Sequence, residues 1–149
     1  MAVQRLGTWI LAAAMFCAAL PARAELPVIS LNAGVYLIRA EVANTFDTRG
    51  RGLMFRETLG PNQGMLFVFS QAERHCMWMK NTPLPLSVAF IDEHGEVVSI
   101  SEMLPHTENS HCAARPATFA LEMNKAWFSS KGIRAGAKIQ GLDKAPPPR

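Results

Sequence analysis

The sequence predicts a mainly β domain, a compact antiparallel sandwich or barrel with one or two short helices. Short apolar runs recur along the chain and are separated by turn residues, which is the pattern of successive strands. In residues 35–42 the apolar side chains alternate with Arg39 and Glu41, as in a half-buried strand. The tight turn 92–95 joins two apolar runs in the manner of a hairpin. Many short strands joined by turns are typical of antiparallel sandwiches and barrels.

The first 24 residues have the pattern of a secretory signal peptide. Arg5 supplies a basic start, residues 6–20 form an apolar run, and residues 22–24 give the small-x-small pattern of a cleavage site. The run is shorter than the roughly 20 residues of a membrane span, although an uncleaved N-terminal anchor is the alternative. We therefore expect a mature chain that begins at Glu25, is periplasmic or secreted, and has no membrane span.

Two strands and a short helix open the mature domain. Strands are expected at 28–31 and 35–42, where β-branched and other apolar residues alternate with polar ones. A short helix is expected at 46–55 because an Asn-Thr pair precedes it and can cap its first turn. Two glycines inside this segment weaken the helix.

Three apolar runs, 64–69, 75–82 and 86–92, predict neighbouring central strands. The last of them forms a hairpin with 96–104, and the long segment 105–116 is expected to be a polar loop. These runs hold the densest group of chemically useful side chains in the chain.

The C-terminal part repeats the same pattern. A strand is expected at 117–123, a short helix at 124–131 that ends at a glycine, and a last strand at 136–142. Three consecutive prolines predict a disordered tail at 144–149. Residues 25–143 are therefore expected to form a single domain.

The charge of the mature chain argues against nucleic-acid binding. The full chain has 15 basic and 12 acidic residues, and Arg5 and Arg23 leave with the signal peptide, so the mature net charge is +1. Its Lys and Arg residues are scattered, whereas nucleic-acid binding needs a concentrated positive face. A glycine-rich phosphate loop, a serine-centred elbow and a His-Glu zinc helix are all absent from the sequence, and no cofactor is indicated.

Several sequence blocks resemble those of DUF family 192, a family of small bacterial and archaeal domains without an assigned reaction. The resemblance covers residues 35–142 and implies a compact β-rich domain that is often exported, but it implies no particular reaction. The blocks are Arg51–Arg56, Gly64–Phe67, Trp78–Thr82, Pro85–Leu86, Ala89–Asp92 and Leu121–Glu122.

Cys76 and Cys112 are the only cysteines that remain after signal cleavage. In an oxidising compartment such a pair predicts a disulfide, which would tie the loop 105–116 to the segment that carries Trp78. A zinc or copper site is the alternative, because two His-Cys dipeptides and nearby methionines offer nitrogen and sulfur ligands. Neighbours on a strand point to opposite faces, however, so one flat strand would not offer both members of a dipeptide to one ion. We therefore assign no metal ligand; the ligands of this alternative would be His75, Cys76, His111 and Cys112, with Met77 and Met79 as soft additions.

The best candidate for a ligand site is the group formed by Trp78, Lys80, Asn81 and Thr82. On a strand, Trp78 and Lys80 share one face, and the two polar residues extend this surface into a loop stiffened by proline. An indole beside an ammonium and an amide can stack on a ring and bind a carboxylate or a hydroxyl. The alternative is structural, with Trp78 in the core and Lys80 paired with Glu122.

Arg56 or Glu122 is expected to complete this surface. Three arginines lie near the expected helix: Arg49, Arg51 and Arg56. They would either converge on an anionic ligand or form an ordinary solvated face, and the solvated face is favoured. Glu122 has no second acid nearby, which argues against glycoside cleavage. The sequence thus predicts an exported binding or accessory module for a small ligand, with a metal-handling protein and an uncharacterised enzyme as the alternatives.

Overall fold

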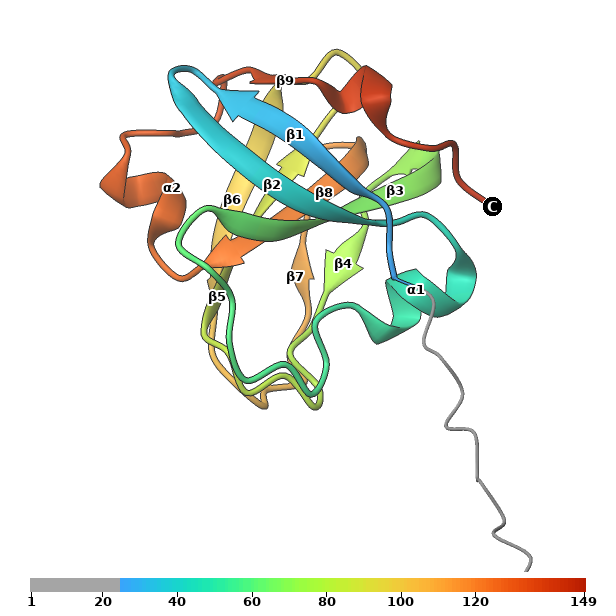
Figure 1. Cartoon of the computed structure of the whole chain (residues 1–149), viewed down its shortest axis with the longest axis vertical. Helices are drawn as coiled ribbons and strands as arrows, with labels where there is room; N and C mark the ends of the chain where they lie inside the picture. Colours follow the sequence, from blue (N-terminus) through green and yellow to red (C-terminus); the bar gives the residue numbers. More distant parts are fainter. Residues whose placement is uncertain (1–24) are drawn as a thin grey trace, which may run out of the picture.

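Seven strands form one strongly curled sheet in the computed structural model, which describes residues 25–149 (Figure 1). The predicted signal peptide lies outside the described residues. Two further short strands form a small separate sheet. The strands are β1 (Val28–Ala33), β2 (Tyr36–Ala43), β3 (Gln63–Glu73), β4 (Cys76–Met77), β5 (Leu86–Ile91), β6 (Val97–Met103), β7 (His111–Cys112), β8 (Ala117–Asn124) and β9 (Ile139–Gln140). The helical elements are α1 (Phe46–Arg51), α2 (Trp127–Ser130) and the 3-10 turn η1 (Leu142–Lys144).

The large sheet has the strand order β6-β5-β8-β3-β2-β1-β9. The predicted mainly β class is confirmed, and all neighbouring pairs are antiparallel except β2 and β3, which pair in parallel. Parallel neighbours need a crossover connection. Here the connection runs through α1 and residues 52–62, and it lays this segment over one face of the sheet, where Gly52 lies against the Phe67 ring.

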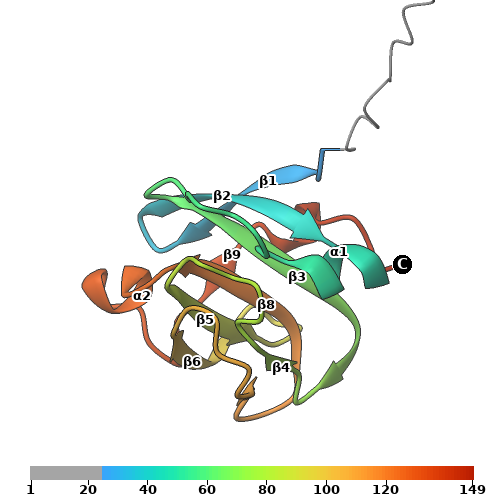
Figure 2. The same ribbon diagram turned by 90° about the horizontal axis from the view of Figure 1, so that it is seen from below.

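The sheet is strongly curled, as seen from below in Figure 2, and its two edges meet at the bridge between Glu96 and Lys138. The segment before and within β9 bonds to the start of β6 through Val97 N–H to Ala137 O at 2.9 Å and Ile139 N–H to Gly95 O at 2.8 Å. β9 also pairs with β1. The curl therefore leaves few unpaired groups at these edges, which limits edge-to-edge association.

Each face of the curled sheet has its own hydrophobic core. In β8, Leu121 and Met123 point into the curl, whereas Ala120 and Glu122 point outward. The outer face is covered by a second layer, to which Leu53, Met79 and other apolar residues of the connecting segments belong. Glu122 therefore occupies a buried position between sheet and cover.

The structure shortens several of the predicted elements. The expected strand 75–82 is a strand only at Cys76–Met77, because the chain then turns, with Thr82 N–H bonded to Met79 O at 3.1 Å. The expected polar loop 105–116 contains β7, which pairs with β4. Thr45, one of the two expected capping residues, caps the first helix. This helix ends at Arg51 and is followed by Gly52, whose φ of 47° is unfavourable for other residues.

The C-terminal tail, for which the sequence predicts disorder, runs beside Asn44 in the structure. The Asn44 Nδ2 donates to Pro147 O at 2.7 Å, and the Arg149 N–H donates to Asn44 O at 2.6 Å. The last residues of the chain thus lie close to the start of α1 (Figure 1).

Candidate functional site

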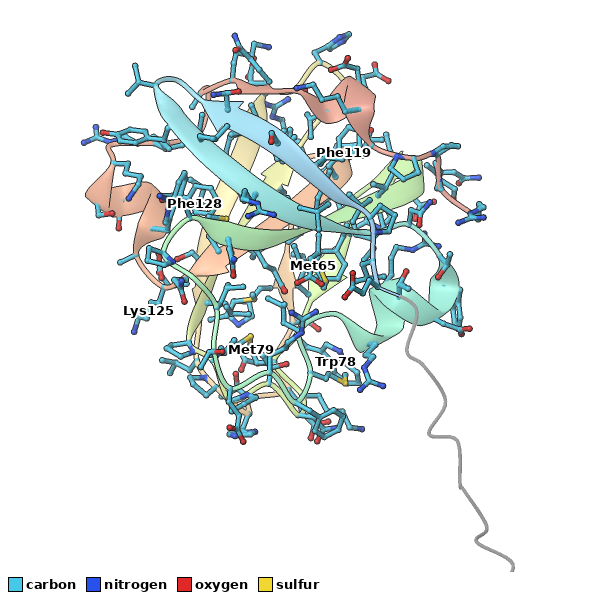
Figure 3. All side chains as sticks on the ribbon, in the orientation of Figure 1. Met65, Trp78, Met79, Phe119, Lys125 and Phe128 are labelled. Carbon is cyan, nitrogen blue, oxygen red and sulfur yellow. A yellow bond between two sulfur atoms is a disulfide. The ribbon has the colours of Figure 1, made fainter. Side chains whose placement is uncertain are left out.

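A small cavity lies on the outer face of the sheet, between α1 and the segment that follows β4. Its volume is about 30 Å³, which is room for about two water molecules. Figure 3 shows Trp78 below α1. The lining includes Arg49, Arg51, Met77, Trp78, Thr82 and Glu122.

Glu122 is the buried polar group of the cavity. The residue is only 3% exposed, and its neighbours across the sheet are the apolar Met65 and Val88. Among residues 25–149 its carboxyl group has no hydrogen-bond or ion-pair partner. Every side-chain oxygen of these residues that is fully enclosed does have a hydrogen-bond partner. The Glu122 oxygens are therefore not sealed in the core, and they reach the cavity that the residue lines.

Burial determines the protonation of this carboxyl group. Removal from water disfavours the charged form and raises the pKa of Glu122 from 4.5 to about 8. At neutral pH most molecules therefore carry Glu122 as the neutral acid, which both donates and accepts a hydrogen bond. Carboxyl groups with strongly shifted pKa values cluster at functional sites.

Two arginines of α1 line the opposite wall of the cavity. Arg49 is held by a hydrogen bond from its Nη1 to Val68 O at 3.0 Å, and Arg51 lies with its guanidinium carbon 5.9 Å from the centre of the Phe55 ring. Within the described residues, neither forms a salt bridge. The sequence predicted that these arginines form a solvated face. In the structure they line the same cavity as the buried acid Glu122.

Arg56 lies apart from this cavity. Its guanidinium donates two hydrogen bonds to the carboxylate of Glu41, at 2.7 and 2.5 Å. The bond to Glu41 raises the pKa of Arg56 further above its ordinary value. Arg56 is therefore engaged in a two-pronged ion pair and is not one of the residues that line the cavity.

The structure brings Trp78 and Thr82 to the cavity with Glu122, whereas Lys80 and Asn81 lie outside the lining. Trp78 is 46% exposed, and the Lys80 Nζ lies 5.2 Å from the centre of its ring. The structural alternative paired Lys80 with Glu122, but in the structure Lys80 forms its salt bridge with Glu108, at 3.7 Å. Lys80 is thus a rim residue.

Two strained residues connect the walls of the cavity. Phe55 and Asn81 have φ angles of 64° and 53°, in the left-handed region that non-glycine residues rarely adopt. The Phe55 N–H donates to Asn81 O at 2.8 Å, and this bond joins the end of the α1 segment to the segment that carries Trp78. Such strain persists only where the surroundings enforce it, and it is enriched at binding sites.

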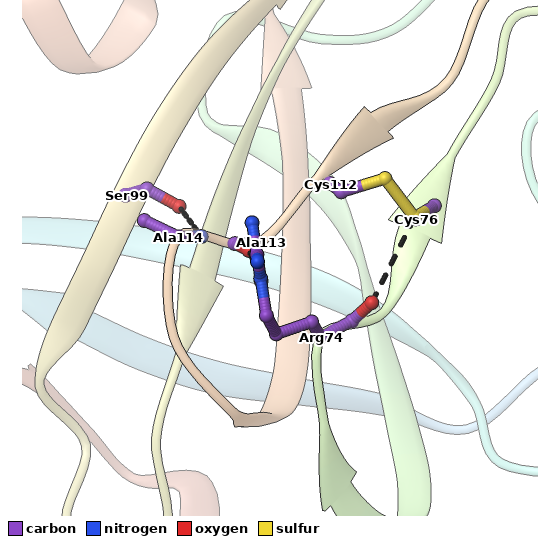
Figure 4. The surroundings of a disulfide bond; sticks show 6 residues. All are labelled: Arg74, Cys76, Ser99, Cys112, Ala113 and Ala114. Atoms are coloured by element: carbon purple, nitrogen blue, oxygen red, sulfur yellow. Dashed lines mark hydrogen bonds between the residues drawn. A yellow bond between two sulfur atoms is a disulfide. The ribbon is translucent and has the colours of Figure 1, made fainter.

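The predicted disulfide between Cys76 and Cys112 is present, and it joins β4 to β7 at directly opposed positions (Figure 4). Two hydrogen bonds reinforce this small sheet: Arg74 Nε donates to Ala113 O at 2.9 Å and joins the segments that flank β4 and β7, and the Ala114 N–H donates to Ser99 Oγ of β6 at 3.1 Å. Because Met77 and Trp78 directly follow Cys76, the disulfide fixes one wall of the cavity.

The disulfide also removes both thiolates from the alternative metal site. The His75 ring stacks on Phe69 at a centroid distance of 3.7 Å, and the His111 Nε2 lies 3.1 Å from Asn109 Nδ2. Within the described part of the chain, the His, Cys, Asp and Glu side chains form no group of three that is placed to hold a metal ion.

A second, wider hollow of about 430 Å³ lies between the β1–β2 hairpin and residues 131–140. Its walls are mostly exposed, and of its two lysines, Lys131 and Lys138, the first lies 4.8 Å from the Trp127 ring and 5.4 Å from the Tyr36 ring. The Glu122 cavity, with its buried acid, is therefore the stronger candidate for a specific site.

Two solved structures share this fold. A protein of unknown function from Novosphingobium aromaticivorans DSM 12444 is 31% identical with a TM-score of 0.75, and the match covers 83% of this chain and 94% of that chain. A proposed transcription regulator from Sinorhizobium meliloti 1021 is 28% identical with a TM-score of 0.75, and the match covers 80% of this chain and 98% of that chain. A search of curated proteins gives no match. The family model of DUF192, described as "Uncharacterized ACR", matches residues 28–141, and the protein therefore belongs to DUF family 192.

Proposed function

We propose that this protein is an exported ligand-binding module and that its site is the cavity at Glu122. The observation that carries the proposal is the Glu122 carboxyl group, which is buried, has no partner among the described residues and reaches a cavity. Buried polar groups are nearly always hydrogen-bonded, and an unpaired one lowers stability. A ligand that supplies the missing hydrogen bond would offset this cost.

The size of the cavity determines how such a ligand would bind. Room for about two waters admits a polar head group but no ring. The body of the ligand would lie outside, against the exposed face of Trp78, where an indole provides apolar contact area. The head group would displace the waters and bond to Glu122.

The proposal of export rests on the signal-peptide pattern of residues 1–24. The Cys76–Cys112 disulfide supports it, because such bonds persist in oxidising compartments. In residues 25–149 no helix has the length and apolar character needed to cross a membrane. Fractionation of cells that express the full chain should recover a processed form that begins at Glu25 outside the cytoplasm.

We do not extend the transcription role ascribed to the Sinorhizobium protein to this chain. The mature charge of +1 and the scattered basic residues offer little release of counterions from nucleic acid. We propose a small molecule as the partner.

The test is a fragment screen by two-dimensional NMR on the processed protein, with uncharged, acidic and basic fragments. The proposal expects shifts concentrated at the Trp78 indole, Arg51 and the backbone of β8, and it expects Glu122→Leu to abolish them. Leucine keeps the side-chain size but removes every hydrogen bond. Glu57→Gln, which changes an exposed carboxylate, is the matched control and should leave the shifts intact. If no fragment shifts these signals in the folded wild-type protein, the ligand-binding function is wrong.

A further inference from the structure

We infer that the ligand of the Glu122 cavity is a small carboxylate, whose two oxygens occupy the cavity between the Glu122 carboxyl group and the guanidinium groups of Arg49 and Arg51. The inference rests on the proposed function, because it names the chemical class that the same site would bind. It follows from the charge, the size and the hydrogen-bonding groups of the lining.

The net charge of the lining is positive in either protonation state of its acid. Arg49 and Arg51 contribute two positive charges, and Glu122 contributes one negative charge or none. An anion is therefore attracted whether or not the acid is ionised, and an ammonium group would add a third positive charge to the same small space. The lining thus selects against a cationic head group.

The size of the cavity favours a planar anion with two oxygens. The volume equals that of about two water molecules, and the two oxygens of a carboxylate would fill it. A phosphate group brings three or four oxygens around a tetrahedral centre and exceeds this space. The neutral Glu122 acid would donate to one oxygen, a short hydrogen bond of the kind that a carboxylate accepts.

Arg49 and Arg51 both line the cavity, and their guanidinium groups offer further hydrogen-bond donors to a ligand there. Arg49 uses one nitrogen, Nη1, on Val68 O, and a guanidinium has five N–H donors in all. The bond to Val68 also fixes the guanidinium, so that little side-chain freedom is lost when a ligand binds. Trp78, Met54 and Met77 offer apolar surface beside the charged groups, which suits an acid with a flat or short apolar body.

The inference includes a pH dependence, because Glu122 must be protonated to donate. Its sheet neighbours Met65 and Val88 do not titrate, and the charged groups that share its cavity are the guanidinium groups of Arg49 and Arg51. The other charged groups nearby are paired with each other: Glu41 with Arg56 in the same row of the sheet, and Lys80 with Glu108 on the rim. Affinity for a carboxylate should therefore fall as the pH rises through the pKa of Glu122, about 8.

The test compares four probes on the processed full-length domain by NMR titration: benzoate, benzyl alcohol, benzylamine and inorganic phosphate. The first three share one ring and differ only in the charge of the head group. We expect benzoate to bind about tenfold more tightly than benzyl alcohol and benzylamine to bind more weakly still. Phosphate should not shift the Trp78 indole signal.

Variants then assign the effect to the named groups. Arg51→Gln changes an exposed residue and should weaken benzoate binding about tenfold while leaving benzyl alcohol unchanged. Arg134→Gln, which removes an exposed arginine outside the lining, is the matched control and should change neither. In Glu122→Gln, the fall of benzoate affinity between about pH 7 and pH 9 should disappear.

The outcomes separate this inference from the proposed function. If benzylamine, benzyl alcohol or phosphate binds at Trp78 more tightly than benzoate, the carboxylate class is wrong and the site itself stands. If none of the four probes shifts the Trp78 and Arg51 signals at millimolar concentration, the carboxylate class is also wrong, and the wider fragment screen decides about the site. Equal benzoate affinity of Arg51→Gln and wild type would likewise overturn the inference.

Discussion

The replacement of Glu122 by Gln should make the protein more stable, and increasingly so as the pH rises. Glutamine has nearly the same shape but cannot ionise. In the wild type the folded state holds the Glu122 proton up to a pKa of about 8, whereas the unfolded chain releases it near 4.5. Between these values the folded state binds more protons than the unfolded state, so wild-type stability falls as the pH rises. The stability of Glu122→Gln does not fall in this way, because glutamine does not ionise.

The size of the effect follows from the two pKa values. A change of one in pKa equals about 1.4 kcal/mol. From pH 4.5 to pH 7 the wild type should therefore lose about 3 kcal/mol relative to Glu122→Gln, and by pH 9 about 4 kcal/mol. These are large fractions of the roughly 5–15 kcal/mol by which domains are usually stable.

The assay is urea denaturation of the wild type and Glu122→Gln at a series of pH values from about 5 to 9, with the midpoint and slope fitted at each. Glu57→Gln, an exposed carboxylate, is the control and should track the wild type within about 0.5 kcal/mol. Wild-type and Glu122→Gln curves that stay parallel across this range would refute the argument, because they would mean that Glu122 ionises equally in the folded and the unfolded chain.

Four further outcomes are expected. Reduction of the Cys76–Cys112 bond, with a sequence separation of 36, should lower the free energy of unfolding by about 4 kcal/mol in urea titrations, and non-reduced peptide mapping should find the link. Arg56→Gln should cost about 2 kcal/mol in the same titrations, because it leaves the partly buried Glu41 without its partner; a silent change would contradict this. Lys80→Met should change stability by less than about 0.5 kcal/mol, since its ion pair is exposed. Fluorescence titration at physiological salt should detect no tight binding of DNA or RNA.

The strands with clear alternation could be predicted from the sequence, because alternation reports directly which face is buried. The strand at 35–42 and the hairpin of β5 and β6 are of this kind. The parallel pairing of β2 with β3 could not be predicted, since it depends on the path of the crossover through α1. The strand predicted at 75–82 was too long because apolar content alone does not reveal the turn at Met79–Thr82.

The candidate site could be predicted only in part, for a similar reason. Trp78, Thr82 and Glu122 could be named as candidates because they belong to dense or unusual strand patterns, and all three line the cavity. Arg49 and Arg51 were given as a solvated face, because nothing in a six-residue helix indicates which side lies over a sheet. The burial of Glu122 also had no local signal, since it results from a second layer assembled from distant segments.

The position of the disulfide determines whether the two halves of the domain stay together after a protease cleaves the chain. The loop between β6 and β7 includes the exposed residues 108–110, which are accessible to cleavage. A cut there divides the chain into a piece that carries β3, β5 and Cys76 and a piece that carries Cys112 and β8. Glu122 lies on the second piece, and its sheet neighbours lie on the first. Because the two pieces remain covalently joined, the nicked protein can keep both walls of the cavity together and retain its site after a break in the backbone.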